Sequence, residues 1–224
     1  LRFEGVVIGG SALGLMGIVG ALHAPFARSL LMKMGGCPLG KASAAEVEQG
    51  RMQAVRTTRG ATQAPARPAL GFTLDASTPE DVHAWANANL VTCNDKREGM
   101  LITCKDVAAS ALMDRKGEPG VVDEVSFAFR PRDRRLVNVT VVSFALPAEE
   151  GARRMQAATE RLSKQEHLGA PTHAAGEATA QRLSQGGFMT ATAKYTYADY
   201  IAEVTATSFT RGVTVHEHFL SATE

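Results

Sequence analysis

The sequence predicts an α+β fold, in which a single N-terminal transmembrane helix precedes a soluble domain of antiparallel β-meanders packed with helices. Three observations lead to this prediction. Residues 5–22 carry no charged side chain. Residues 69–224 contain short runs in which apolar residues alternate, the period of half-buried strands. Each of two helix signals is followed by such runs, an order that buries one sheet face under helices. The repeated order is also that of a degenerate duplication.

The apolar segment 5–22 has eighteen residues, near the length that a tilted helix needs to cross a bilayer. Gly5 and Gly9, and again Gly10 and Gly14, are four residues apart, a spacing that lets two helices approach closely in lipid. We therefore expect a membrane anchor that packs through its glycines on a partner protein or on a second copy. A signal peptide removed after residues 19–21 and a helix buried in a globular core are the alternatives.

Composition divides the chain into three regions. Residues 1–36 form the membrane anchor and an interfacial helix, 37–68 a helical spacer with a Pro/Ala linker, and 69–224 the α+β domain. Residues 1–68 carry a net charge of +5, which suits contact with anionic lipid headgroups. Residues 69–224 carry −4, which argues against nucleic acid as a partner. The high content of Ala, Arg, Gly and Thr is typical of GC-rich bacteria.

Cysteines and basic residues predict opposite membrane topologies. Cys93 and Cys104 lie in two short β-like runs separated by a polar turn, so they can face each other as a disulfide. A disulfide indicates an oxidising compartment such as the periplasm, whereas buried free thiols are the alternative. Basic residues after the anchor favour a domain that faces the cytoplasm. We predict the bacterial inner membrane as the location, with the domain in the periplasm.

The spacer and the first half of the domain are predicted in order along the chain. A helix is expected over residues 43–56 and a strand over 69–74. The next helix begins near Pro79, since Thr78 and Asp81 have capping-box spacing and proline suits the first turn. Trp85 lies on the apolar face of that helix and is interpreted as a core anchor. Strands follow near residues 91 and 101, and then a hairpin of 125–129 with 137–141, where Val and Phe alternate.

The second half begins with a helix over residues 147–168 that ends at Gly169. Its inward face carries Ala152, Met155, Ala158 and Leu162. A short helix is expected within 174–184. Three strands then form a meander at residues 188–197, 200–209 and 212–220.

The segment Leu168-Gly169-Ala170-Pro171-Thr172 follows a helix and precedes a meander. In this it is similar to small bacterial envelope lipoproteins of the outer-membrane assembly type, which also place helices before a three-stranded sheet. By analogy, the resemblance implies an interaction module of the cell envelope. It transfers no site residue.

Two candidate sites stand out. His216 and His218 are two apart in a predicted strand and therefore share a face, so both imidazoles can approach one metal ion. Glu217 falls on the other face and is not expected to be a ligand, and zinc requires three or four. Arginines in the 130–135 turn either contact an anion or form a solvated hairpin tip: Arg130, Arg132, Arg134 and Arg135.

No nucleophile motif, zinc-protease motif or phosphate-binding loop appears in the sequence, so no catalytic residue and no cofactor is predicted. The favoured function is a non-enzymatic interaction or assembly subunit of an envelope complex, with membrane lipid and a protein or second copy as partners. One alternative is a ligand-binding, metal-binding or hydrolytic domain that uses His216, His218 and a pocket between sheet and helices. Another is a regulatory domain facing the cytoplasm.

Overall fold

The computed structural model describes residues 44–97, 99–112, 115, 120–185 and 187–223. Of these, Glu48 onward belong to one compact unit. The predicted transmembrane segment 5–22, with Gly5, Gly9, Gly10 and Gly14, lies outside the described residues. Among the described helices, none has the length and apolar character needed to cross a bilayer.

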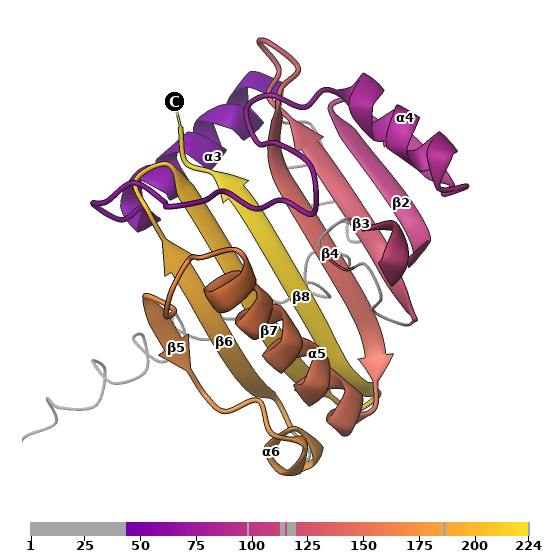
Figure 1. The fold of residues 1–224 in the computed structure, drawn as a ribbon, viewed down its shortest axis with the longest axis vertical. Coiled ribbons are helices and arrows are strands. Elements are labelled where there is room, and N and C mark those ends of the chain that lie inside the picture. Colours follow the sequence, from indigo (N-terminus) through magenta and orange to yellow (C-terminus); the bar gives the residue numbers. More distant parts are fainter. Residues whose placement is uncertain (1–43, 98, 113–114, 116–119, 186, 224) are drawn as a thin grey trace, which may run out of the picture. The chain divides into compact units, whose positions relative to one another are not determined.

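Eight strands form one antiparallel sheet in the order β1-β2-β3-β4-β8-β7-β6-β5 (Figure 1). The predicted α+β class with antiparallel meanders is thereby confirmed, although the sheet is larger than the three-stranded one that the resemblance implies. The elements are α3 Ala44–Thr58, α4 Pro79–Ala88, β1 Cys93–Lys96, β2 Leu101–Ala108, a 3₁₀ turn Ala109–Ala111, β3 Val121–Phe129, β4 Leu136–Leu146, α5 Ala148–Glu160, a π-helical segment Arg161–Gln165, β5 His173–Ala175, α6 Ala180–Ser184, β6 Met189–Thr196, β7 Tyr200–Phe209 and β8 Gly212–Ser221.

The sheet consists of two meanders, β1 to β4 and β5 to β8, which meet where β4 pairs with β8. A helix precedes each meander: α4 the first and α5 the second. Each half therefore places a helix before a four-stranded antiparallel meander, and α6 is an addition within the second half.

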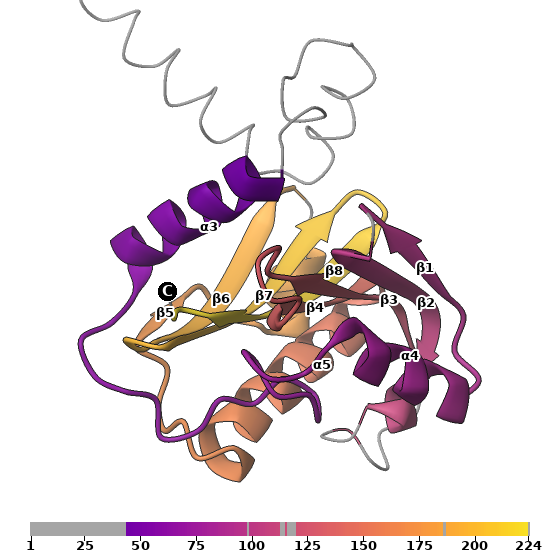
Figure 2. The same ribbon diagram turned by 90° about the horizontal axis from the view of Figure 1, so that it is seen from above.

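The two faces of the sheet differ sharply in polarity. Figure 2 shows α4 and α5 on one side of the sheet and α3 on the other. On the side of α5, one row of paired residues crosses all eight strands and is apolar except for a single carboxylate: Cys93, Cys104, Val125, Val141, Glu217, Val204, Ala193 and Ala174. The neighbouring row on the other face is polar: Asn94, Thr103, Ser126, Thr140, His218, Glu203, Lys194 and His173. Alternation along each strand therefore separates a core face from a polar face.

The predicted strand at residues 69–74 is wrong, because this segment forms turns. Leu70 has a positive φ of 61°, outside the extended region of a regular strand, and Gly71 follows with φ 91°. The side chains of Ala69, Leu70 and Leu74 are nevertheless buried. These apolar residues fill the core from a loop, a role that periodicity cannot distinguish from a buried strand.

The spacer helix, predicted over residues 43–56, is confirmed as α3. Val55 is fully buried and packs with Ile201 and Ala222 on the polar side of the sheet. The guanidinium of Arg51 donates a hydrogen bond to the carbonyl of Ser221 at 2.7 Å. The second half of α3 is therefore part of the fold of the α+β unit.

Gly151 allows α5 to approach β8 closely. A Cβ atom added at Gly151 would lie 2.5 Å from Cγ1 of Val213, a branched side chain in the sheet. Gly50 in α3 offers a matched comparison, because an added Cβ there meets no atom within 4 Å.

We expect Gly151→Ala to lower the free energy of unfolding by about 1–3 kcal/mol, the usual effect of overpacking. We expect Gly50→Ala to raise it by up to about 1 kcal/mol, since alanine is the better helix former. Urea unfolding of both variants measures the difference. Equal stabilisation by both substitutions would show that α5 does not pack closely on Val213.

Candidate functional site

An open groove of about 430 Å³ lies between α5 and β5 on the core side of the sheet. One wall comes from α5 and the π-helical segment that follows it, and the other from β5 and the residues beside it. The lining residues are Met155, Gln156, Thr159, Glu160, Ser163, Lys164, Pro171, Ala174, Gly176, Ala178, Thr192 and Ala193.

The groove forms because α5 covers β7 and β8, whereas the neighbouring strands β5 and β6 carry small side chains there. The helix α5 packs on β7 and β8, and Figure 1 shows it in front of these strands with β5 at the edge of the sheet. Beyond the helix, the residues that line the groove from the same side of the sheet are Ala193 on β6 and Ala174 on β5. Their methyl groups leave the space beside Met155 unfilled.

Polar groups form the rim of the groove. Lys164 Nζ and Glu160 Oε1 form an ion pair at 2.7 Å, and Gln156 donates a hydrogen bond to the carbonyl of Ala178 at 3.0 Å. The Ser163 and Tyr195 hydroxyls are 2.8 Å apart. Burial raises the pKa of Tyr195, so its hydroxyl remains a neutral hydrogen-bonding group. A groove with an apolar floor and a polar rim suits a ligand such as a peptide, whose apolar side chain contacts the floor while its polar main chain contacts the rim.

The strand β5 is the last strand of the sheet, and its three residues are exposed. Within the described ranges, β6 is its sole strand partner. The outer edge of β5 therefore presents main-chain groups of the kind that pair with an added strand.

A buried ion cluster fixes the end of α5 to the centre of the sheet. Glu217 is 3 % exposed and accepts hydrogen bonds from Arg115 and from Arg161, the latter at 2.5 Å. Burial by itself raises the pKa of Glu217, but the two guanidinium groups outweigh it and hold this pKa below its ordinary value. Arg161 opens the π-helical segment, a form of helix that is frequent at functional sites. The cluster therefore positions the groove wall that carries Ser163 and Lys164.

The cluster was not predicted from the sequence. One feature of the sequence could have indicated it. Glu217 shares a strand face with the apolar residues Val215 and Phe219, and a carboxylate buried on that face requires a cation beside it. Nothing in the local sequence identifies Arg115 or Arg161 as that cation.

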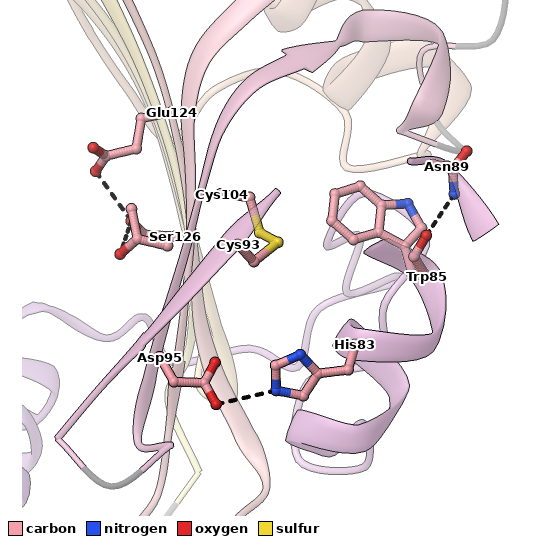
Figure 3. Close-up of a disulfide and its surroundings, with 9 residues drawn as sticks. His83, Trp85, Asn89, Cys93, Asp95, Cys104, Glu124 and Ser126 are labelled. Atoms are coloured by element: carbon pink, nitrogen blue, oxygen red, sulfur yellow. Dashed lines mark hydrogen bonds and ion pairs between the residues drawn. A yellow bond between two sulfur atoms is a disulfide. The ribbon is translucent and has the colours of Figure 1, made fainter. Parts of the chain in front are cut away.

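The predicted pairing of Cys93 with Cys104 is confirmed, because the two form a disulfide with Cα atoms 4.0 Å apart (Figure 3). The bond joins the edge strand β1 to β2. Trp85 packs against the core as predicted, with its indole nitrogen donating to the carbonyl of Ala111 at 2.9 Å. Also in Figure 3, His83 of α4 approaches Asp95 of β1 at 3.3 Å.

The four arginines proposed as an anion site have carboxylate or carbonyl partners within the chain. Arg130 is buried and pairs with Asp75 at 3.1 Å and with Asp133 at 3.2 Å. Arg132 and Arg134 lie near Asp133 and Glu80, and Arg135 donates to the carbonyl of Ala76. Arg130 therefore ties the β3–β4 turn to the loop before α4. The other three stay candidates for an anion contact.

His216 and His218 share the polar face of β8, as predicted, with ring centroids 6.1 Å apart. The helices α4 and α5 lie on the opposite face, so the expected pocket between sheet and helices does not contain these histidines. The reason is the alternation of the strand, which turns Glu217 toward α5 and its neighbours away. Among the described residues, no group of three or more side chains is arranged to hold a metal ion.

Comparisons with known proteins identify no relative. No protein-family model, curated protein or solved structure matches this chain.

Proposed function

We propose that this chain is a membrane-anchored bacterial envelope protein, a non-enzymatic interaction or assembly subunit of a larger complex. Its domain binds an extended segment of a partner protein. That segment adds to the outer edge of β5 and places an apolar side chain in the groove between α5 and β5.

The observation that carries this proposal is the position of the groove beside an exposed edge strand. Peptides that add to a sheet edge gain affinity from main-chain hydrogen bonds and specificity from pockets for alternate side chains. Here β5 offers the edge, and Ala174 and Ala193 form the floor of the adjacent pocket. A helix would suit the site less well, because α5 already occupies the space above β7 and β8.

The disulfide supports a location outside the cytoplasm, since such bonds persist in oxidising compartments. The periplasmic side of the inner membrane is therefore favoured over a cytoplasm-facing regulatory domain. The anchor proposed at residues 5–22 holds the domain near membrane partners, and its glycine faces provide a second contact surface.

Two substitutions on the same strand test the groove. Ala174 faces the groove, whereas Ala175 pairs with Thr192 and its side chain points to the opposite face. Both alanines are exposed, so tryptophan at either position should leave the fold intact. We expect the wild-type chain, extracted from native membranes in detergent without reductant, to migrate as a large complex on a native gel.

In the same experiment Ala174→Trp should release the complex, and Ala175→Trp should retain it. Mass spectrometry of the complex then distinguishes a partner protein from a second copy. A monomeric wild-type chain, or a complex that survives Ala174→Trp, would overturn the proposal. Loss of the complex in both variants would contradict the groove as the binding site.

A further inference from the structure

Two imidazoles are held side by side at the centre of the polar face. β8 lies between β4 and β7, so hydrogen-bonded ladders fix His216 and His218 from both sides. Their rings are nearly parallel, inclined by 18°, with centroids 6.1 Å apart. Adjacent imidazoles on one metal ion, bound through nitrogens about 2.0–2.1 Å away, have centroids roughly 4.5–5 Å apart. Rotation about both χ1 and χ2 is therefore required to bring one nitrogen of each ring to a shared ion.

Across the part of the chain that the structure describes, neither imidazole takes part in a hydrogen bond or an ion pair, and the two rings stack on each other. The residues opposite them on the neighbouring strands are Thr140 and Glu203 for His218, and Val142 and Thr205 for His216. The ring nitrogens are therefore available to a ligand.

The charges around the pair do not repel a cation. Glu203 lies across from His218 and forms an ion pair with Lys194 at 3.5 Å, so the nearest opposite charges balance.

We propose that His216 and His218 together bind one Cu²⁺ ion on the polar face of the sheet, with water as the remaining ligands. Imidazole nitrogen is a preferred ligand of Cu²⁺, which also stands highest in affinity among the first-row divalent ions. Two imidazoles and water satisfy a tetragonal copper site, whereas zinc requires more protein ligands than the described residues supply. The site faces away from the groove, so it is independent of the proposed peptide binding.

The test is a titration of the metal-free full-length chain, purified in detergent, with CuCl₂. We expect one equivalent of Cu²⁺ to bind, with an electron paramagnetic resonance spectrum showing hyperfine coupling to two imidazole nitrogens. His216→Gln and His218→Gln should each weaken binding about tenfold or more and remove the two-nitrogen pattern. His173→Gln serves as control, since His173 lies at the sheet edge on the same face and should leave the spectrum unchanged.

Thermal unfolding with and without Cu²⁺ distinguishes a variant that has lost the metal site from one that has not folded. Cu²⁺ should raise the unfolding midpoint of the wild-type and His173→Gln chains and leave that of the other two variants unchanged. Wild-type protein that binds no stoichiometric Cu²⁺ would overturn the proposal. So would His216→Gln and His218→Gln variants that bind it with the wild-type spectrum. Ala174→Trp should bind Cu²⁺ normally, so failure of the groove and failure of this site are distinguishable.

Discussion

Glu217→Gln is expected to lower the free energy of unfolding by about 3–5 kcal/mol, because it removes the carboxylate charge that two buried guanidinium groups share. Arg115 and Arg161 are both almost fully buried, so bulk solvent does not surround their charges. Urea unfolding at pH 7 measures the effect. The matched control is Glu203→Gln on the neighbouring strand, where the ion pair with Lys194 is partly exposed and should contribute less than about 1 kcal/mol.

The stabilisation that Glu217 provides is expected to depend on pH. Because the pKa of Glu217 is lower in the folded chain than in the unfolded chain, the unfolded state binds more protons between these two pKa values. The stabilisation by Glu217 is therefore complete above its ordinary pKa of 4.5 and is lost as the pH falls through the folded value. The stability difference between wild type and Glu217→Gln should narrow on acidification below that point. A difference that is small at pH 7, or constant down to pH 3, would contradict the role of the cluster.

Loss of the Cys93–Cys104 disulfide is expected to lower the free energy of unfolding by about 3 kcal/mol. The bond closes a short loop, since the cysteines are 11 positions apart in sequence. It also holds β1, a four-residue strand at the edge of the sheet. We therefore expect reduction to accelerate hydrogen exchange of the β1 amides, while those of β7 and β8 remain protected.

The double variant Cys93→Ala/Cys104→Ala provides the control for reduction. It should reproduce the loss of stability and show no further change when reductant is added. Intact mass of the chain, extracted without reductant, reports whether the bond forms in the cell, since the bridged chain is two hydrogens lighter. Free thiols in native protein would remove the support for a periplasmic domain.

Most elements of the fold could be predicted because their signals are local. Thr78 and Asp81 form the capping box that starts α4, and the three strands after α6 lie within a residue or two of their expected bounds. Alternation also placed His216 and His218 on one face and Glu217 on the other. These features depend on residues at most four apart, so the sequence expresses them directly.

The candidate sites depend on contacts between distant residues. Glu217 meets Arg161 and Arg115 across sequence separations of 56 and 102 residues. The groove depends on α5 lying over β7 and β8, which leaves the alanines of β5 and β6 uncovered. Neither arrangement has a local signal, because many arginines and many alanines in the chain are equally suitable by composition.

The sequence by itself therefore determined most of the elements, their order and the polarity of the strand faces, through short-range periodicity and capping. It did not predict the edge strand β5. Only the tertiary structure decided that β4 pairs with β8, which guanidiniums neutralise Glu217, and where the sheet face remains open. The tertiary structure also decided the turns at Leu70 and Gly71. The side chain of Leu70 packs in the core, and this long-range packing favours a loop over the strand that the local composition suggests. Long-range packing selects among locally equivalent residues, and that selection is made when the whole chain collapses around one core.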